Sequence, residues 1–262
     1  MAKIKLAWNR IVLGFTVLGL AVCLIVYISS ANRGDPVCKG IEIKIRNLEE
    51  VKLIAPGNLE RMIEQSRIAG KGKPLNDDVV KKVLKLVSSK GSVKNVLAYQ
   101  TGDSILHVEL EQRIPVVRIL TSAGSCYLDG EGIAFPSVAG YACDTPLVTG
   151  KIRLPAEGKR LTDSVFARNL LEFAEFVSNS PFWNAQIQQI DVDENRNVEF
   201  AVCSDSHLIR FGQLNGYKRK LDNLLTFYRK VNPYYRERDN SPYRILDLRF
   251  NRQIVAIKGN ND

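Results

Sequence analysis

The chain is poor in the residues and motifs that catalytic and cofactor-binding sites use. It has two histidines among 262 residues, His107 and His207, and no HxH or HxxxH spacing links them. It also lacks a GxSxG nucleophile turn, a P-loop, a GxGxxG fingerprint and a CxxC pair. We therefore expect no enzyme, no cofactor, no metal site and no small-molecule substrate, and we expect both histidines to be structural or surface residues.

Charge is absent from one long segment near the N-terminus. No charged side chain occurs between Ile11 and Asn32, and a single transmembrane helix needs roughly 20 such residues. Lys3, Lys5 and Arg10 precede the segment, and positive flanks stay in the cytoplasm. The pattern predicts a cytoplasmic tail over residues 1–10, a transmembrane helix over 11–32 and an exported body.

Two other interpretations of this segment stay open. Ser29 and Ala31 are small residues at positions where a signal peptide is cleaved, although the apolar core of such a peptide is usually about 7–15 residues, shorter than 11–28. Cys23 follows a passage that resembles a lipoprotein site, but Val22 stands where a small residue is needed. The retained anchor is the interpretation that we favour.

The charge and cysteine content of the body is consistent with an exported protein. The formal net charge of the whole chain is +9, which includes the three positive residues before the apolar segment, so the body is mildly basic. A basic surface favours anionic lipids, acidic partners or nucleic acid. Export argues against nucleic acid, and a solvated basic surface is the simpler explanation. Cys126 and Cys143 are close enough in sequence to form a disulfide in an oxidising compartment, with buried free thiols as the alternative.

The first part of the body has the pattern of a small α+β unit. Residues 39–46 alternate in polarity like a strand with one buried face. A short helix opens at Pro56, and a second helix follows Asn76, which is a suitable cap. Two strands follow, over residues 93–99 and 104–111. The order strand-helix-helix-strand-strand allows the two helices to cover one face of a three-stranded sheet.

From Ile114 the sequence becomes rich in β patterns. Its last helix is expected over residues 216–231, and its last hairpin joins Arg244–Phe250 to Gln253–Lys258 through a tight Asn251-Arg252 turn. If Gln253–Lys258 is an edge strand, it offers unpaired backbone groups to a partner strand. The alternative is an edge protected by Lys258 and the short tail after it.

The pattern as a whole resembles the bacterial cell-division protein family FtsQ, called DivIB in Gram-positive bacteria. Four passages carry the resemblance: Glu109–Val116, Tyr127–Phe135, His207–Gly212 with the helix Lys218–Tyr228, and Leu246–Phe250. The resemblance implies an α+β fold with a transmembrane helix, a POTRA-like domain over residues 38–112, a mixed β domain over 113–258 and a tail over 259–262.

The resemblance also implies a function and a location. It implies a non-enzymatic scaffold that bridges early and late proteins of the divisome, spans the inner membrane once, exposes its body to the periplasm and gathers at the septum. Its β domain would bind FtsB- and FtsL-like partners through the terminal edge. The implied contact residues are Arg196, Phe250, Gln253, Ile254, Val255, Ala256, Ile257 and Lys258.

Two departures from the family and two other functions remain open. The Asn251-Arg252 turn lacks glycine, and the cysteines are not typical of the family. A membrane-anchored POTRA-type envelope assembly factor is the main alternative, and an exported envelope hydrolase is the second. The hydrolase would need an acid/base pair, and Asp129 and Glu131 lie in a glycine-bounded turn where aspartate usually serves local hydrogen bonding.

Overall fold

The computed structural model describes residues 16, 18–27, 35–137, 143–202, 207–231 and 243–259. The chain divides into two compact units, one of residues 1–44, 57–85 and 97–108 and one of residues 45–56, 86–96 and 109–262. The predicted domains 38–112 and 113–258 do not coincide with these units, because parts of 38–112 belong to each. As a description of independently folding domains, they stay a prediction.

The apolar N-terminal segment is described only in part. Residues 18–27 are helical and exposed, whereas residues 11–15, 17 and 28–32 of the predicted span lie outside the described residues. Within the residues that the structure describes, no helix has the length and apolar character needed to cross a membrane. The transmembrane helix over 11–32 therefore stays a prediction.

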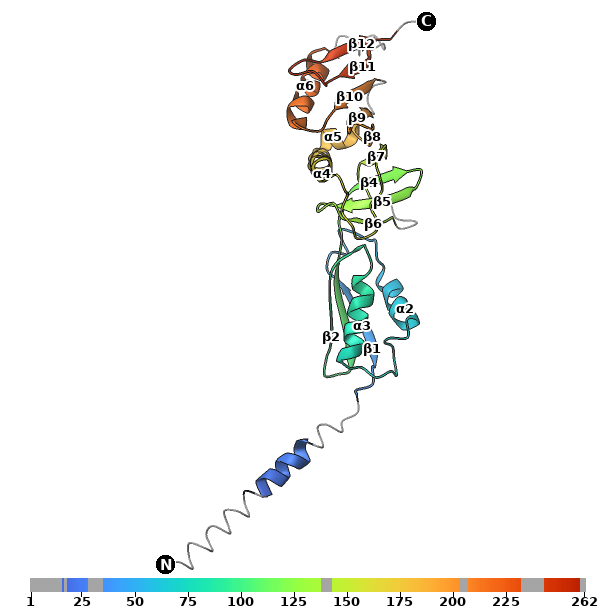
Figure 1. Cartoon of the computed structure of the whole chain (residues 1–262), viewed down its shortest axis with the longest axis vertical. Helices are drawn as coiled ribbons and strands as arrows, with labels where there is room; N and C mark the ends of the chain where they lie inside the picture. Colours follow the sequence, from blue (N-terminus) through green and yellow to red (C-terminus); the bar gives the residue numbers. More distant parts are fainter. Residues whose placement is uncertain are drawn as a thin grey trace, which may run out of the picture. The chain divides into compact units, whose positions relative to one another are not determined.

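A three-stranded sheet and two helices follow in the predicted order (Figure 1). The elements are β1 (Gly40–Ile45), α2 (Pro56–Gln65), α3 (Asp77–Ser88), β2 (Val93–Gln100) and β3 (Ile105–Gln112), with the strand order β1-β3-β2. Asn76 caps α3 as expected, since its side-chain oxygen accepts a hydrogen bond from the Val79 amide at 3.0 Å. Burial alternates along β3, so one face of the sheet belongs to the core.

A mixed sheet of nine strands forms the rest of the body. Its elements are β4 (Pro115–Thr121), β5 (Gly124–Asp129), β6 (Ala134–Pro136), β7 (Leu147–Gly150), α4 (Ser164–Ser178), α5 (Pro181–Gln186), β8 (Gln189–Val192), β9 (Val198–Ala201), β10 (Leu208–Gly212), α6 (Tyr217–Lys230), β11 (Tyr243–Asp247) and β12 (Val255–Lys258). The strand order is β12-β11-β10-β9-β8-β7-β4-β5-β6. The predicted mixed β domain with covering helices is thus confirmed.

One continuous core joins the helices to this sheet. Phe173 of α4 packs against Phe200 of β9, Phe211 of β10 and Tyr217 of α6, with ring centroids 5.5–6.4 Å apart. Leu221 and Leu224 of α6 are fully buried in the same cluster. The apolar stripe of α6 therefore holds the helix against the core that includes β9 and β10.

The terminal hairpin differs from its predicted form. The Asn251-Arg252 turn is present, but β11 ends at Asp247 and β12 begins at Val255, so the strands are shorter than expected and a seven-residue connection joins them. Beyond Asp247 the chain bonds locally and to β10 instead: the Asp247 side chain accepts the amide of Arg249, and the Leu248 amide donates to Arg210 O. Gln253 and Ile254 consequently lie before the edge strand and not within it.

Candidate functional site

The strand β12 forms one end of the nine-stranded sheet (Figure 1). It pairs antiparallel with β11, with Leu246 opposite Ala256 and Asp247 opposite Val255. No strand within the described part of the chain pairs with its other side. The edge therefore presents backbone donors and acceptors that an added strand can use.

Side chains on β12 alternate between the core and solvent. Ile254, just before the strand, and Ala256 pack against the main core. Val255 and Ile257 point away from it and are 38% and 39% exposed. The strand is thus anchored through one face and presents two apolar side chains on the other.

Phe250 lies in the connection between β11 and β12. Its side chain is 48% exposed. It lines a surface hollow of about 460 Å³ that includes three basic residues, Arg219, Lys220 and Arg249. The connection thus combines an exposed aromatic ring with positive charge.

A buried carboxylate organises this connection. Asp247 is 3% exposed, and its oxygens accept hydrogen bonds from Arg249 Nε at 2.9 and 3.0 Å and from Nη2 at 2.6 Å. Burial by itself would raise the pKa of Asp247, but the bonds from Arg249 and the charge of Arg210 outweigh burial and lower the pKa. Asp247 is therefore held as an anion.

The neighbouring residues complete this arrangement. Gly212 has a φ of +73°, and a Cβ there would lie 2.8 Å from Arg249 Cγ, so only glycine leaves room for the arginine chain. Lys220 donates to the carbonyl oxygens of Phe211 and Gln213 at 2.8 and 2.7 Å. Burial and the nearby Arg219 lower the pKa of Lys220, and Asp247 opposes this change.

Arg196 is engaged elsewhere in the fold. It lies in the turn between β8 and β9, where its Nε is 3.2 Å from Asp163 Oδ2 and its Nη1 donates to Lys151 O at 2.7 Å. Asp163 caps α4 by accepting the Phe166 amide. The structure does not bring Arg196 together with the edge, because β10 and β11 lie between β9 and β12.

The structure shows no bond between Cys126 and Cys143, for which the sequence left a disulfide and buried thiols open. Cys126 is a buried free thiol, and burial raises its pKa to about 11. Cys126 belongs to the main core, whereas Cys143 packs against Tyr127 and Phe135 in a separate cluster. Because consecutive strand residues point to opposite faces, Cys126 faces away from Cys143. Cys203 lies outside the described residues.

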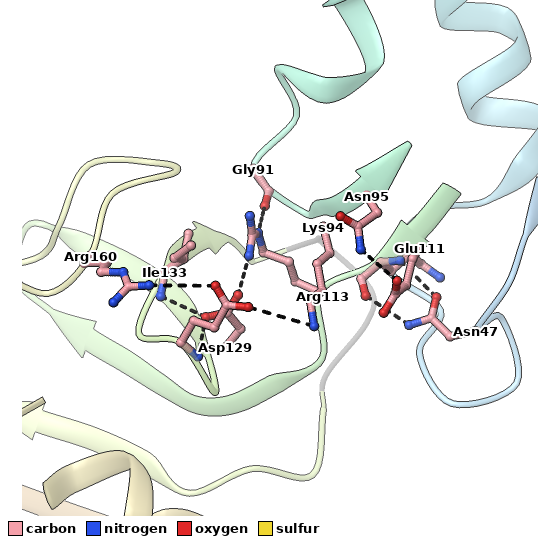
Figure 2. A network of polar contacts seen from close by, with 11 residues as sticks. Asn47, Gly91, Lys94, Asn95, Glu111, Arg113, Asp129, Ile133 and Arg160 are labelled. Carbon is pink, nitrogen blue, oxygen red and sulfur yellow. Dashed lines mark hydrogen bonds and ion pairs between the residues drawn. The ribbon is translucent and has the colours of Figure 1, made fainter. Parts of the chain in front are cut away.

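A second buried ion pair joins two of the passages that carry the family resemblance (Figure 2). Arg113 Nη1 and Asp129 Oδ2 are 2.5 Å apart, with side chains only 14% and 7% exposed. Arg113 also donates to Gly91 O at 3.0 Å. Asp129 Oδ1 accepts the amides of Glu131 and Ile133, so Asp129 holds the hairpin turn. Both carboxylate oxygens are therefore occupied by structural contacts.

Asn47, which is labelled in Figure 2, continues the polar contacts through its hydrogen bonds with Gln112. Gln112 is fully buried, donates to Val51 O at 2.7 Å and accepts the Ile54 amide at 2.6 Å. Asn47 exchanges two hydrogen bonds of 2.9 Å with the Gln112 backbone. These bonds hold the segment Val51–Ile54 in place, and Val51 packs against Tyr127 of β5 and Phe135 of β6.

The two histidines make local contacts. His107 stacks on Tyr99 and pairs with Glu42 at 3.2 Å. His207 is buried, and its Nε2 lies 2.9 Å from the hydroxyl of Tyr228. Throughout the described ranges, no three His, Cys, Asp or Glu residues come close enough to hold a metal ion.

Comparison with known proteins agrees with the fold. A POTRA-like domain model matches residues 36–111, and a model described as FtsQ/DivIB, C-terminal related, matches residues 114–257. Both are families of non-catalytic scaffold domains. The chain therefore combines a POTRA-like domain with an FtsQ/DivIB C-terminal related domain. It belongs to the FtsQ/DivIB family. No curated protein matches it.

Proposed function

We propose that this chain is a non-enzymatic scaffold of the bacterial divisome. It bridges early and late division proteins and binds FtsB- and FtsL-like single-pass partners through its C-terminal edge strand during septum formation. The observation that carries the proposal is the open edge of β12, with half-exposed Val255 and Ile257. Membership of the FtsQ/DivIB family supports the division role.

Strand addition fits the chemistry of this edge. A partner strand gains backbone hydrogen bonds along β12, and its side chains alternate in phase with those of Val255 and Ile257. Apolar cross-strand pairs contribute roughly 0.2–1 kcal/mol each. The proposed contact residues are Phe250 and Val255–Lys258, with Gln253 and Ile254 at the entrance to the strand. Arg196 belongs to the set through the family resemblance alone.

We further propose that residues 11–32 form the single membrane span, with the N-terminus cytoplasmic and the body periplasmic. The positive residues before the span support this orientation. A tether of this kind keeps the edge near the membrane, where single-span partners expose their own segments. Membership of the FtsQ/DivIB family supports a location at the division site.

The test is co-purification of FtsB- and FtsL-like proteins with the full chain and with variants. Truncation after Phe250 removes β12, and Ile257→Lys places a charge on its exposed face. We expect truncation to abolish co-purification and Ile257→Lys to reduce it. Leu120→Lys is the matched control, because Leu120 is equally exposed, at 40%, but lies in β4. Unchanged co-purification after truncation of a folded body would refute the proposal.

A POTRA-type assembly factor remains the second candidate because the small sheet also has open ends. Its order β1-β3-β2 places β2 at an edge, where Leu97 is 50% exposed. Such a factor would bind client strands along β2. Retention of partners after truncation, combined with their loss in Leu97→Lys, would favour this function.

A further inference from the structure

The exposed connection between β11 and β12 depends on a carboxylate that is itself hidden. Asp247 is 4% exposed in its side chain, whereas that of Arg249 is 51% exposed. Three atoms of Arg249 donate to Asp247: the backbone nitrogen at 3.0 Å, Nε, and Nη2. Asp247 therefore fixes both the backbone and the guanidinium of a residue that solvent and partners can reach.

Close packing against β10 also restricts the conformation of the Arg249 side chain. The aliphatic chain of Arg249 lies over Gly212, where a Cβ would approach Cγ, Cδ and Cβ of the arginine to 2.8, 3.5 and 3.6 Å. The Leu248 amide bonds to Arg210 O at 2.9 Å. The connection is thus held against β10 at two successive residues, Leu248 and Arg249. Two passages of the family resemblance, which are far apart in sequence, meet at this point.

We infer that Asp247 is a positioning residue: through Arg249, it holds the connection that leads into β12 in one geometry before any partner arrives. Ordering a flexible connection upon binding lowers affinity, and a connection that is already ordered avoids this loss. The inference rests on the proposed function for its binding consequence. The ordering of the connection can be measured without a partner.

The partner-free test is hydrogen exchange in the full chain. In Asp247→Asn, the charge that holds the guanidinium is lost while the shape is kept. We expect amides from Arg249 to Val255 to exchange about tenfold faster, the change that corresponds to one hydrogen bond of a charged group. Asp222→Asn is the control, since it makes the same change of charge at an exposed aspartate of α6 that is not one of the groups holding Arg249. Unchanged exchange in Asp247→Asn would overturn the inference.

Arg249→Lys provides a second variant if Asp247→Asn does not fold. Lysine keeps the positive charge but cannot place two donors on the carboxylate. Because the Arg249 side chain is half exposed, a substitution at this position leaves the core intact. We expect the same faster exchange in the connection, and normal exchange would count against positioning.

The binding test uses the extracytoplasmic segment of the FtsB-like protein from the same genome. We expect Asp247→Asn and Arg249→Ala each to weaken binding about tenfold, and the double variant to weaken it no more than Arg249→Ala alone. A purely structural role for Asp247 would give additive losses. If the wild-type chain does not bind this segment, the proposed function fails, while the exchange result still decides the positioning role.

Discussion

The two ends of the nine-stranded sheet each contain a buried aspartate paired with an arginine, yet one end is closed and the other is open. At the β6 end, Ala134 bonds to Lys159 and Gly158 through its backbone, and Ile133 forms an isolated bridge with Arg160. At the β12 end, no strand among the described residues pairs with the outer side of β12. The same kind of ion pair, aspartate with arginine, therefore occurs in two different structural settings.

The exposure of the arginine separates the two cases. Arg113 is 14% exposed, so its pair with Asp129 lies inside the structure and joins the segments around it. Val51 and Leu53 also pack on Tyr127 and Phe135 at this end. Arg249 is half exposed, so its pair with Asp247 orients a surface residue. An internal pair stabilises the fold, whereas a half-exposed pair shapes a surface.

The largest effect is expected from Asp129→Ala at the closed end. The change leaves the Arg113 charge buried without a partner and removes the acceptor of two amides. We expect a loss of about 3–5 kcal/mol in the free energy of unfolding. Urea unfolding, followed by the fluorescence of the buried Trp183, measures this loss. Lys94→Ala is the control, because its exposed 4.0 Å pair with Glu131 contributes at most about 1 kcal/mol.

A smaller loss is expected from Gln112→Met, which keeps the volume but removes both polar groups. Val51 O and the Ile54 amide then lose their side-chain partner. We expect a loss of about 1–3 kcal/mol in the same unfolding measurement. Asn95→Ala, which removes an exposed bond to Glu111, should change stability much less. Equal losses in the two variants would contradict the role of Gln112.

At the open end, Asp247 should make stability depend on pH. The pKa of this carboxylate is lowered below its ordinary 3.8 in the folded state. Its stabilisation is thus present above 3.8 and is lost as the pH falls through the lower, folded pKa. We expect Asp247→Asn to cost about 1.5 kcal/mol at neutral pH. The difference from wild type should shrink below pH 3.8, and a constant difference would contradict this prediction.

The smallest stability effect is expected from Ile257→Ala on the open edge. Because Ile257 is 39% exposed, its truncation should change the free energy of unfolding by less than about 0.5 kcal/mol. Its effect should appear in partner binding, measured by pull-down of the FtsB-like protein. Leu120→Ala is the matched control. A large loss of stability with unchanged binding would contradict the prediction, because Ile257 would then stabilise the fold and not bind the partner.

Local patterns predicted most of the elements, and they failed where contacts between distant residues decide. The α6 helix, expected over 216–231, is observed at Tyr217–Lys230, because its apolar spacing is regular. The short helix α5 was missed, although Ser180 before Pro181 is a recognisable start signal. The Cys126–Cys143 bridge is absent because proximity in sequence does not tell which side of a strand a cysteine faces.

The site was predicted as a strand but not as an arrangement of side chains. The terminal strand follows from alternation in the sequence, whereas its place at the edge of the sheet follows only from the observed strand order. Asp247, Arg249 and Gly212 were recognised only as parts of family motifs, without roles. Gln112 is polar and fully buried, which no periodicity indicates.

The sequence by itself determined the order of strands and helices, the apolar N-terminal segment and the absence of catalytic motifs, because these depend on local spacing and composition. Only the tertiary structure decided which aspartate meets which arginine and how far each is buried. Such pairs join residues from different strands and turns, and their energy depends on the solvent that the whole fold excludes. For this reason Asp129 stabilises the interior at one end of the sheet, while Asp247 orients an exposed arginine at the other end.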